Sequence, residues 1–495
     1  VSSPKMDLLQ RRLDDVLCYL APHWNFVNCH MVNYSTDKHW LQFIPEAIRA
    51  EFHTIDDINK AIESLIWQSD RDSQRFPVLA KFLAAAEHER LQAHPELLTT
   101  VEQLEELLAA KRQSELSIKE FMSAKKYHEV ERTAALVNKL VHGTAIEPSA
   151  SYIVDAGDGK GYLSSRLSIQ YELRVLGIDA NASNTENALS RNRKLQKAWN
   201  GLTERAELQS QGITPPRRGK KSTTTAATIV PPSLENYKTT ARFITTKLNL
   251  TDLLVDHFNI QPTDIKPSIC LTGLHTCGNL ASTCLRVFHA QENCRLLCNI
   301  GCCYHLLREH YSQQEFFGNK ALMDMQTDYG FPLSSYLQKR KVCLGRNARM
   351  LAAQSIERTI AAKELPNITL YYRALLEVLV CRHAPHLKNE LQVGKVRKFA
   401  NFQEYVQKCA EKLNEPWLAA VTHDELEGLL DEYQQDRHYL ELFHLLRMSF
   451  APVLESVILL DRLLYLREQG YANSFLIDLF DAVISPRHFA IVAIK

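Results

Sequence analysis

Apolar residues near the start of the chain recur at helical spacing. Leu9, Leu13, Val16 and Leu20 repeat every three or four residues, and a second series with the same period runs from Val101 to Leu108. One apolar stripe per helix is what an amphipathic helix needs in order to pack against a core. The pattern predicts a helical N-terminal region over residues 1–145.

Between residues 147 and 179 the pattern changes to an apolar run, a glycine-rich turn, a helical stretch and a second apolar run. This order is typical of βα units in a parallel sheet. Three more strand-like runs follow, at Arg242–Leu248, Ser268–His275 and Leu296–Gly301. The alternation predicts an α/β core with a Rossmann-like sheet over residues 146–310.

The segment Thr203–Thr240 interrupts this alternation. It is rich in Pro, Gly and Thr, has little apolar periodicity, and carries a basic cluster at residues 217–221. We expect a flexible insertion at residues 203–240, because such composition buries little apolar surface. The basic cluster fits a solvated linker, a nuclear-import signal or an RNA contact.

Helical spacing returns over residues 311–450, which we interpret as a helical insertion. The remaining residues, 451–495, contain a predicted helix at Leu454–Arg467, a short one around Ser474–Phe480, and an apolar run at His488–Lys495. This last run reads as a buried strand. Residues 451–495 are therefore expected to complete the α/β core.

Composition narrows the class of protein. The 495 residues are 45% hydrophobic and 23% charged, and 58 Lys and Arg nearly balance 57 Asp and Glu, so no global charge favours nucleic acid or a membrane surface. No apolar run approaches the roughly 18 residues of a membrane span, and the first residues lack the apolar core of a secretion signal. With 12 cysteines and no such signal, we expect free thiols and a cytoplasmic or nuclear protein without a membrane partner.

Residues 155–161 read DAGDGKG and join the first predicted strand to a helix. Gly157, Gly159 and Gly161 allow a sharp turn and a close ligand approach, and the following helix offers free N–H groups. Asp179 ends the next strand, where a carboxylate accepts hydrogen bonds from ribose hydroxyls. The alternative is that Asp179 only caps the following helix.

The glycine spacing G-x-G-x-G, preceded by Asp155, differs from the G-x-G-x-x-G of dinucleotide-binding loops, which disfavours a nicotinamide oxidoreductase. It resembles motif I of class I S-adenosylmethionine-dependent methyltransferases. That resemblance implies that the glycine loop holds the amino-acid end of S-adenosyl-L-methionine, with Asp155 near its ammonium and Asp179 on its ribose. It also implies that Asn249 lies near the adenine.

Two further segments follow the fourth and fifth predicted strands: residues 272–280 read TGLHTCGNL and residues 299–305 read NIGCCYH. With the DAGDGKG turn they resemble the methyltransferase-like protein 25 family, whose relatives are also described as ribosomal RNA adenine dimethylase domain-containing. The resemblance extends to residues 123–129, 331–334 and 459–495. The H-x-C-G and C-C-x-H pair is also similar to tRNA ribose 2′-O-methyltransferases, over the α/β core alone.

This sequence departs from the family in two ways. Asp158 stands where the loop usually has Ser or Gly, and a carboxylate near the carboxylate of the cofactor would weaken binding. The alternative is that the Asp158 side chain points outward. No N/D-P-P-Y/F segment follows the fourth strand, which argues against an adenine amino-methylating enzyme.

Methyl transfer to a neutral acceptor needs a group that accepts a proton. His275 and His305 are the candidate bases, because an imidazole titrates near neutral pH, and Tyr304 could orient the acceptor. The alternative is that these residues pack structurally. A helix carrying Lys125 and Glu129 precedes the first strand, a position that in this fold class can close over the cofactor; a solvated charged face is equally consistent.

A zinc site is the competing interpretation of the same segments. Its ligands would be His275, Cys277, Cys302, Cys303 and His305. No C-x-x-C pair is present, so we predict no metal and interpret the other cysteines of this region as small buried residues.

The sequence thus predicts an S-adenosylmethionine-dependent methyltransferase that acts on a macromolecule. RNA is favoured slightly over protein by the ribose-methyltransferase resemblance and the basic cluster. The alternative is a non-catalytic methyltransferase-fold scaffold. Nothing in the sequence indicates an oligomeric state.

Overall fold

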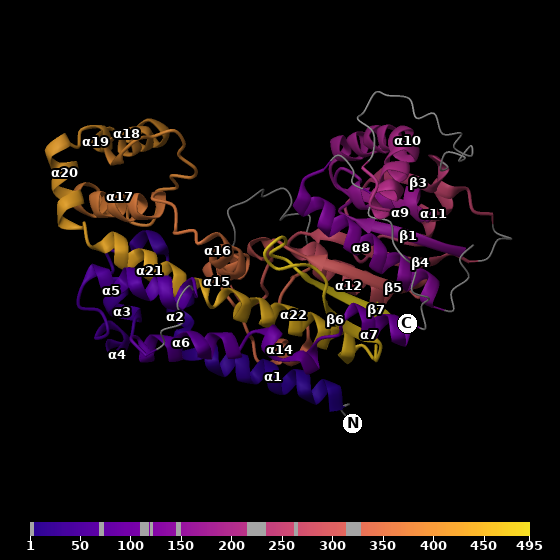
Figure 1. Cartoon of the computed structure of the whole chain (residues 1–495), viewed down its shortest axis with the longest axis horizontal. Helices are drawn as coiled ribbons and strands as arrows, with labels where there is room; N and C mark the ends of the chain where they lie inside the picture. Colours follow the sequence, from indigo (N-terminus) through magenta and orange to yellow (C-terminus); the bar gives the residue numbers. More distant parts are fainter. Residues whose placement is uncertain are drawn as a thin grey trace. The chain divides into compact units, whose positions relative to one another are not determined.

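The computed structural model describes residues 4–68, 74–108, 118, 122–144, 150–214, 234–261, 266–312 and 328–495 (Figure 1). Two compact units divide the chain. The sheet unit comprises Val1–Asp14, His94–Ala353 and Glu455–Lys495, and the helical unit comprises Asp15–Ala93 and Gln354–Leu454. The predicted basic cluster at 217–221 lies outside the described residues.

The sheet unit is built around seven strands. They are β1 (Ser151–Ala156), β2 (Arg174–Asp179), β3 (Tyr237–Ala241), β4 (Ser268–Thr276), β5 (Cys294–Gly301), β6 (Ser474–Asp478) and β7 (Phe489–Ile494). Their order in the sheet is β3-β2-β1-β4-β5-β7-β6, with β1 to β5 parallel and β7 antiparallel to both of its neighbours. This confirms the Rossmann-like α/β fold, completed by strands from the C-terminal segment.

Two predicted elements were wrong. The third strand is Tyr237–Ala241 rather than Arg242–Leu248, because Tyr237 pairs with Val175 of β2 while the later apolar residues belong to a loop with buried Ile244. Residues around Ser474–Phe480 form strand β6 and not a short helix. Their partner is β7, which follows later in the chain, so local periodicity carries no sign of the pairing.

Helices flank the sheet. The sheet unit contains α7 (Val101–Leu107), α8 (Ala124–Gly143), α9 (Tyr162–Gln170), α10 (Ala182–Ser210), α11 (Leu250–Phe258), α12 (Asn279–Ala290), α14 (Ser335–Lys339) and α15 (Arg346–Ala352). Helix α10 and strand β3 occupy both ends of the segment predicted as a flexible insertion. Of that segment, residues 215–233 lie outside the described part of the chain.

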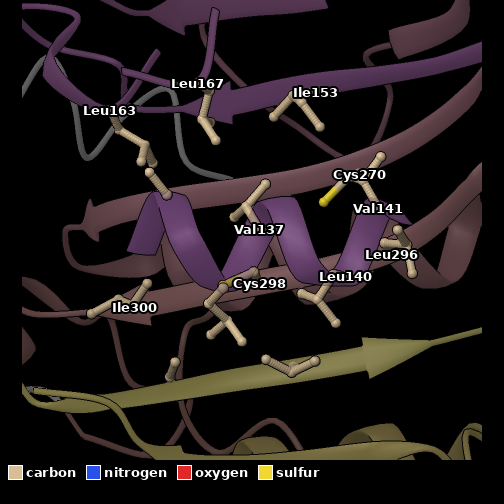
Figure 2. Packing of buried hydrophobic residues seen from close by; sticks show 14 of the residues in the cluster. Val137, Leu140, Val141, Ile153, Leu163, Leu167, Cys270, Leu296, Cys298 and Ile300 are labelled. Carbon is tan, nitrogen blue, oxygen red and sulfur yellow. The ribbon is translucent and has the colours of Figure 1, made fainter. Parts of the chain in front are cut away.

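Helix α8 lies along the sheet and forms much of its core (Figure 2). Val137, Leu140 and Val141 on one face of α8 are buried in a cluster with strand residues that include Ile153 and Cys298. Burying such side chains stabilises the fold by about 1.5–3 kcal/mol each. Since this packing fixes α8 on the sheet, polar groups at its N-terminal end have defined positions.

The helical unit combines segments from both predicted helical regions. Its helices are α2 (Trp24–Asn28), α3 (His39–Phe43), α4 (Glu46–Arg49), α5 (Ile55–Ala61), α6 (Pro77–His88), α16 (Ile356–Ala362), α17 (Thr369–His383), α18 (Phe402–Leu413), α19 (Pro416–Ala419), α20 (His423–Glu432) and α21 (Asp436–Met448). Helices α1 (Pro4–Leu20) and α22 (Ala451–Glu468) contribute residues to both units. Of the described residues in the N-terminal region, 15–93 therefore belong to the same unit as most of the helical insertion, whereas 4–14 and those between 94 and 144 belong to the sheet unit.

The stretch Asp436–Glu468 is long and apolar enough to cross a membrane when judged by length and composition. However, 83% of its most apolar window is buried within the protein, as in the core helix of a folded domain. It is weak evidence for a membrane span, and the absence of a membrane partner stays a prediction.

Candidate active site

The DAGDGKG turn has the backbone that its glycines predict. Gly157, Gly159 and Gly161 have φ angles of 78°, 58° and 66°, in the left-handed region that residues with a Cβ rarely adopt. A Cβ on Gly161 would lie 2.5 Å from the hydroxyl of Tyr237. The amide of Gly157 donates to the carbonyl of Ile178 at 2.9 Å, which ties the turn to the end of β2.

Asp155 and Asp158 form a buried carboxylate pair under this turn. The Ser164 hydroxyl lies 2.9 Å from Asp155 Oδ2 and 2.6 Å from Asp158 Oδ1, and the Tyr237 hydroxyl donates to Asp158 Oδ2. Gly177 leaves room for the pair, because a Cβ there would lie 2.3 Å from Asp158 Oδ2. Asp158 therefore points into the protein beneath β2.

Burial raises the pKa of both carboxyls. The pKa of Asp155 lies well above the ordinary value. Burial is the largest cause, and repulsion from the charge of Asp158 is the next. The pKa of Asp158 rises to about 6 despite hydrogen bonds from Ser164 and Tyr237. This pair therefore takes up a proton more readily than exposed carboxyls do.

Asp179 lies at the end of β2 and braces the glycine turn. Its carboxylate accepts hydrogen bonds from the amide of Gly159 at 3.0 Å, the amide of Asn181 at 2.8 Å and the side chain of Asn184 at 3.1 Å. The cap of α10 is Asn181, whose side chain accepts from the amide of Ser183 at 3.0 Å. Asp179 is thus the last residue of β2 and not the cap of α10.

Asn249 caps helix α11. Its side chain accepts hydrogen bonds from the amides of Thr251 and Asp252 at 3.0 and 3.4 Å. It is exposed and lies beyond a loop that separates it from the end of β3 at Ala241. Its predicted place near the adenine stays a prediction.

His275 is joined to a buried carboxylate on α8. Its Nε2 lies 3.0 Å from Oε2 of Glu129, which is 1% exposed, whereas the His275 side chain is 37% exposed. The Ser485 hydroxyl donates to the other oxygen of Glu129 at 2.6 Å, and Lys125 Nζ lies 3.7 Å from it. The structure therefore gives Glu129 a buried, paired position and not a solvated one.

The electrostatics of Glu129 follow from these contacts. Burial raises its pKa, but the hydrogen bond and charge of His275, the hydroxyl of Ser485 and the charge of Lys125 outweigh burial, so the net pKa is lowered. Glu129 is therefore an anion that orients His275. Such an orienting carboxylate is the usual partner of a catalytic imidazole.

Tyr304 and His305 share the short helix η8 (Tyr304–Leu306) but differ in environment. Tyr304 is buried and donates its hydroxyl to Glu455 at 2.7 Å; burial and then the Glu455 charge raise its pKa well above the usual value. Arg487 also donates to Glu455, at 2.9 Å. His305 is half-buried beside Cys303. The structure thus does not place the Tyr304 hydroxyl at an open surface.

The loops after β4 and β5 are fastened together. A Cβ on Gly278 would lie 2.8 Å from the carbonyl oxygen of Leu306. The side-chain oxygen of Asn279 accepts from the amide of Arg308 at 2.8 Å, and its nitrogen donates to the carbonyl of Asp328 at 2.9 Å. The side chains of the loop after β4 therefore have fixed positions relative to those of the loop after β5.

These loops bring together three thiols. Cys277 Sγ lies 3.2 Å from Cys302 Sγ, which lies 3.6 Å from Cys303 Sγ. Hydrogen bonds from the other two thiols, with the nearby charges of His305 and His275, lower the pKa of Cys303. These three cysteines are among the five ligands of the competing zinc interpretation, and the structure brings their thiols together. By contrast, the predicted buried positions are confirmed for Cys270, Cys284, Cys294 and Cys298.

Comparison with known proteins agrees with this architecture. Residues 125–310 match the family described as "Methyltransferase domain". The matched part begins in α8 at Lys125 and includes Glu129, the glycine turn and the two cysteine- and histidine-containing segments, residues 272–280 and 299–305.

Two relatives align along the whole chain. The human protein "Probable methyltransferase-like protein 25" is 27% identical, with 100% of this chain and 98% of the relative covered, and the mouse protein of that name has the same identity and coverage. A methyltransferase domain implies a methyl donor. This chain is accordingly a methyltransferase, similar along its full length to methyltransferase-like protein 25.

Proposed function

We propose that the protein transfers a methyl group from S-adenosyl-L-methionine to a macromolecule, with RNA as the favoured acceptor. The observation that carries the proposal is the glycine turn at the end of β1 beside Asp179 at the end of the neighbouring strand. Open parallel sheets bind their ligands at the carboxyl ends of strands. The resemblance to class I enzymes supplies the identity of the cofactor.

The residues present fit that cofactor. A Cβ built on Gly159 would lie no closer than 3.8 Å to any other described atom, so at this position the turn is not tightly packed against the described residues. Asp179, half-buried at the turn, is a carboxylate of the type that accepts from ribose hydroxyls. When bound, the cofactor supplies a methyl group already activated by its sulfonium.

His275 is the best-placed base for the acceptor proton. Strand β4 pairs with β1 in parallel, and Thr272 lies opposite Asp155. His275 lies three residues later on β4, toward the carboxyl end of the sheet where the glycine turn follows β1. Glu129 holds the Nε2 side of its ring. An oriented imidazole of this kind accelerates proton transfer by about 10²–10⁴-fold.

A basic pocket in the helical unit favours RNA. Arg373, Lys395, Arg397 and Lys398 line a cavity of about 370 Å³ together with Phe399. Cations bind phosphate oxygens, and aromatic rings stack on unpaired bases. None of the described residues that line this pocket is acidic. A cytoplasmic or nuclear location is part of the same proposal.

The experiment follows labelled methyl from S-adenosylmethionine into extract of cells that lack the protein, before and after nuclease or protease treatment. We expect the wild-type protein to give label that nuclease removes. Label removed by protease would replace RNA with a protein acceptor. No label in any fraction, from folded protein that binds the cofactor, would favour the scaffold.

A variant of Glu129 tests the proposed base. Glu129→Gln keeps the size of the side chain but removes the charge, so we expect kcat to fall by about 10²-fold, with the KM for cofactor unchanged and the acid side of the pH–rate profile displaced. Glu106→Gln changes an exposed carboxylate on α7 and serves as the control. Equal rates for wild-type and Glu129→Gln would remove His275 from this role.

A further inference from the structure

The thiols of Cys277, Cys302 and Cys303 form a cluster with the donor set of a metal site. All three sulfur atoms lie within 4.8 Å of one another. Among the residues that the structure describes, this is the only such group of three or more Cys, His, Asp or Glu side chains. Cys277 is exposed, Cys303 is half-buried and Cys302 is buried, so the cluster has a path to solvent.

The backbone around Cys277 has a conformation that fixes the position of this thiol. His275 and Gly278, on either side of Cys277, have φ angles of 71° and 56°. A left-handed backbone is unfavourable for a residue with a Cβ, so surrounding contacts must maintain it at His275. The contact of Gly278 with Leu306 also joins the loop that carries Cys277 to the segment that follows Cys302 and Cys303.

The sulfur positions match a tetrahedral ion. Zinc binds thiolate at about 2.3 Å, which places two sulfur ligands about 3.8 Å apart in a tetrahedron. The observed separations of 3.2 and 3.6 Å are about 0.6 and 0.2 Å shorter than this, and Cys277 Sγ and Cys303 Sγ lie within 4.8 Å of each other. Small shifts of flexible side chains would accommodate the ion.

We propose that Cys277, Cys302 and Cys303 bind a zinc ion, with the fourth position open to solvent. Thiolates are preferred ligands of zinc, and three protein ligands with one open position describe an accessible site. The sequence argued against metal because it has no C-x-x-C pair. Here the donors come from two loops that only the fold brings together. The proposal does not depend on the identity of the methyl acceptor.

The test uses the full-length protein, purified under reducing conditions, loaded with zinc and then dialysed. We expect elemental analysis to give about one zinc per chain. Cobalt substituted for zinc should give the thiolate-to-cobalt charge-transfer band in the near ultraviolet. Cys277→Ser and Cys303→Ser should weaken zinc retention against a chelator by roughly 100-fold or more, since loss of even an outer partner costs 10–100-fold.

Cys18→Ser is the matched control, because Cys18 is exposed and lies outside the cluster; it should retain zinc like the wild type. Circular dichroism verifies that each variant is folded. If a variant does not fold, the cobalt spectrum of the wild type decides the question. Folded wild-type protein that retains no zinc, or a cobalt spectrum without thiolate bands, would overturn the proposal. So would a Cys277–Cys302 disulfide that persists in protein purified under reducing conditions and exposed to zinc.

Discussion

The buried carboxyl pair under the glycine turn predicts an unusual pH dependence of stability. Asp158→Asn removes one acid of the pair and preserves its size. The pKa of Asp158 is about 6 in the folded protein, against an ordinary 3.8. Two pKa units correspond to about 3 kcal/mol, because each unit is worth about 1.4 kcal/mol.

The sign follows from proton uptake. Between about pH 4 and pH 6 the folded protein holds a proton on Asp158 that the unfolded chain has released, so stability falls as the pH rises through this range. The stabilisation that Asp158 gives the folded protein is fully present below the pKa of Asp158 in the unfolded chain, and it is lost above the pKa of Asp158 in the folded protein. Asp158→Asn should therefore gain stability relative to the wild type by up to about 3 kcal/mol between pH 4 and pH 7.

Amide hydrogen exchange of β1 and β2, corrected for intrinsic exchange rates, measures this difference within the sheet unit. The comparison is made at several pH values for wild type, Asp158→Asn and Asp256→Asn. Asp256 is exposed on α11 and provides the control. If wild type and Asp158→Asn show the same change of stability with pH, the buried-pair account is refuted.

Three further variants test buried contacts within the sheet unit. Asp461→Ala leaves the amides of Leu333 and Ser334 and the Ser334 hydroxyl without their buried acceptor; we expect a loss of about 3–6 kcal/mol, seen as a lower calorimetric Tm. Gly177→Ala pushes a methyl group into Asp158, and should cost about 1–3 kcal/mol in the same assay; an unchanged Tm would contradict this close contact. Tyr304→Phe removes a buried donor to Glu455 and should cost about 1–2 kcal/mol while the rate of methyl transfer is kept; a large loss of rate in a folded variant would instead restore Tyr304 as a catalytic candidate.

The glycine turn and the parallel strands around it could be predicted from sequence because their signals are local. An apolar run, three glycines at fixed spacing and a carboxylate after the next strand lie within one short segment. Backbone conformation at a glycine depends on the residue itself and its neighbours. The left-handed angles of Gly157, Gly159 and Gly161 confirm that reading.

The rest of the site depends on contacts between distant segments. Glu129 meets His275 and Ser485, from three separate parts of the chain, so spacing cannot distinguish it from an exposed helical carboxylate. Strand β6 was missed for the same reason. Gly177 was the available signal for Asp158: a glycine within a buried strand indicates a close approach by another group.

Equilibrium binding of S-adenosylmethionine tests the central claim most directly. Calorimetry would compare wild type with Gly159→Arg and Asp179→Ala, and with Gly201→Arg as a control on an open position of α10. The account predicts one cofactor per chain for wild type and the control, and no binding for the two site variants while they stay folded. Folded wild-type protein that binds no cofactor, or site variants that bind as the wild type does, would contradict it.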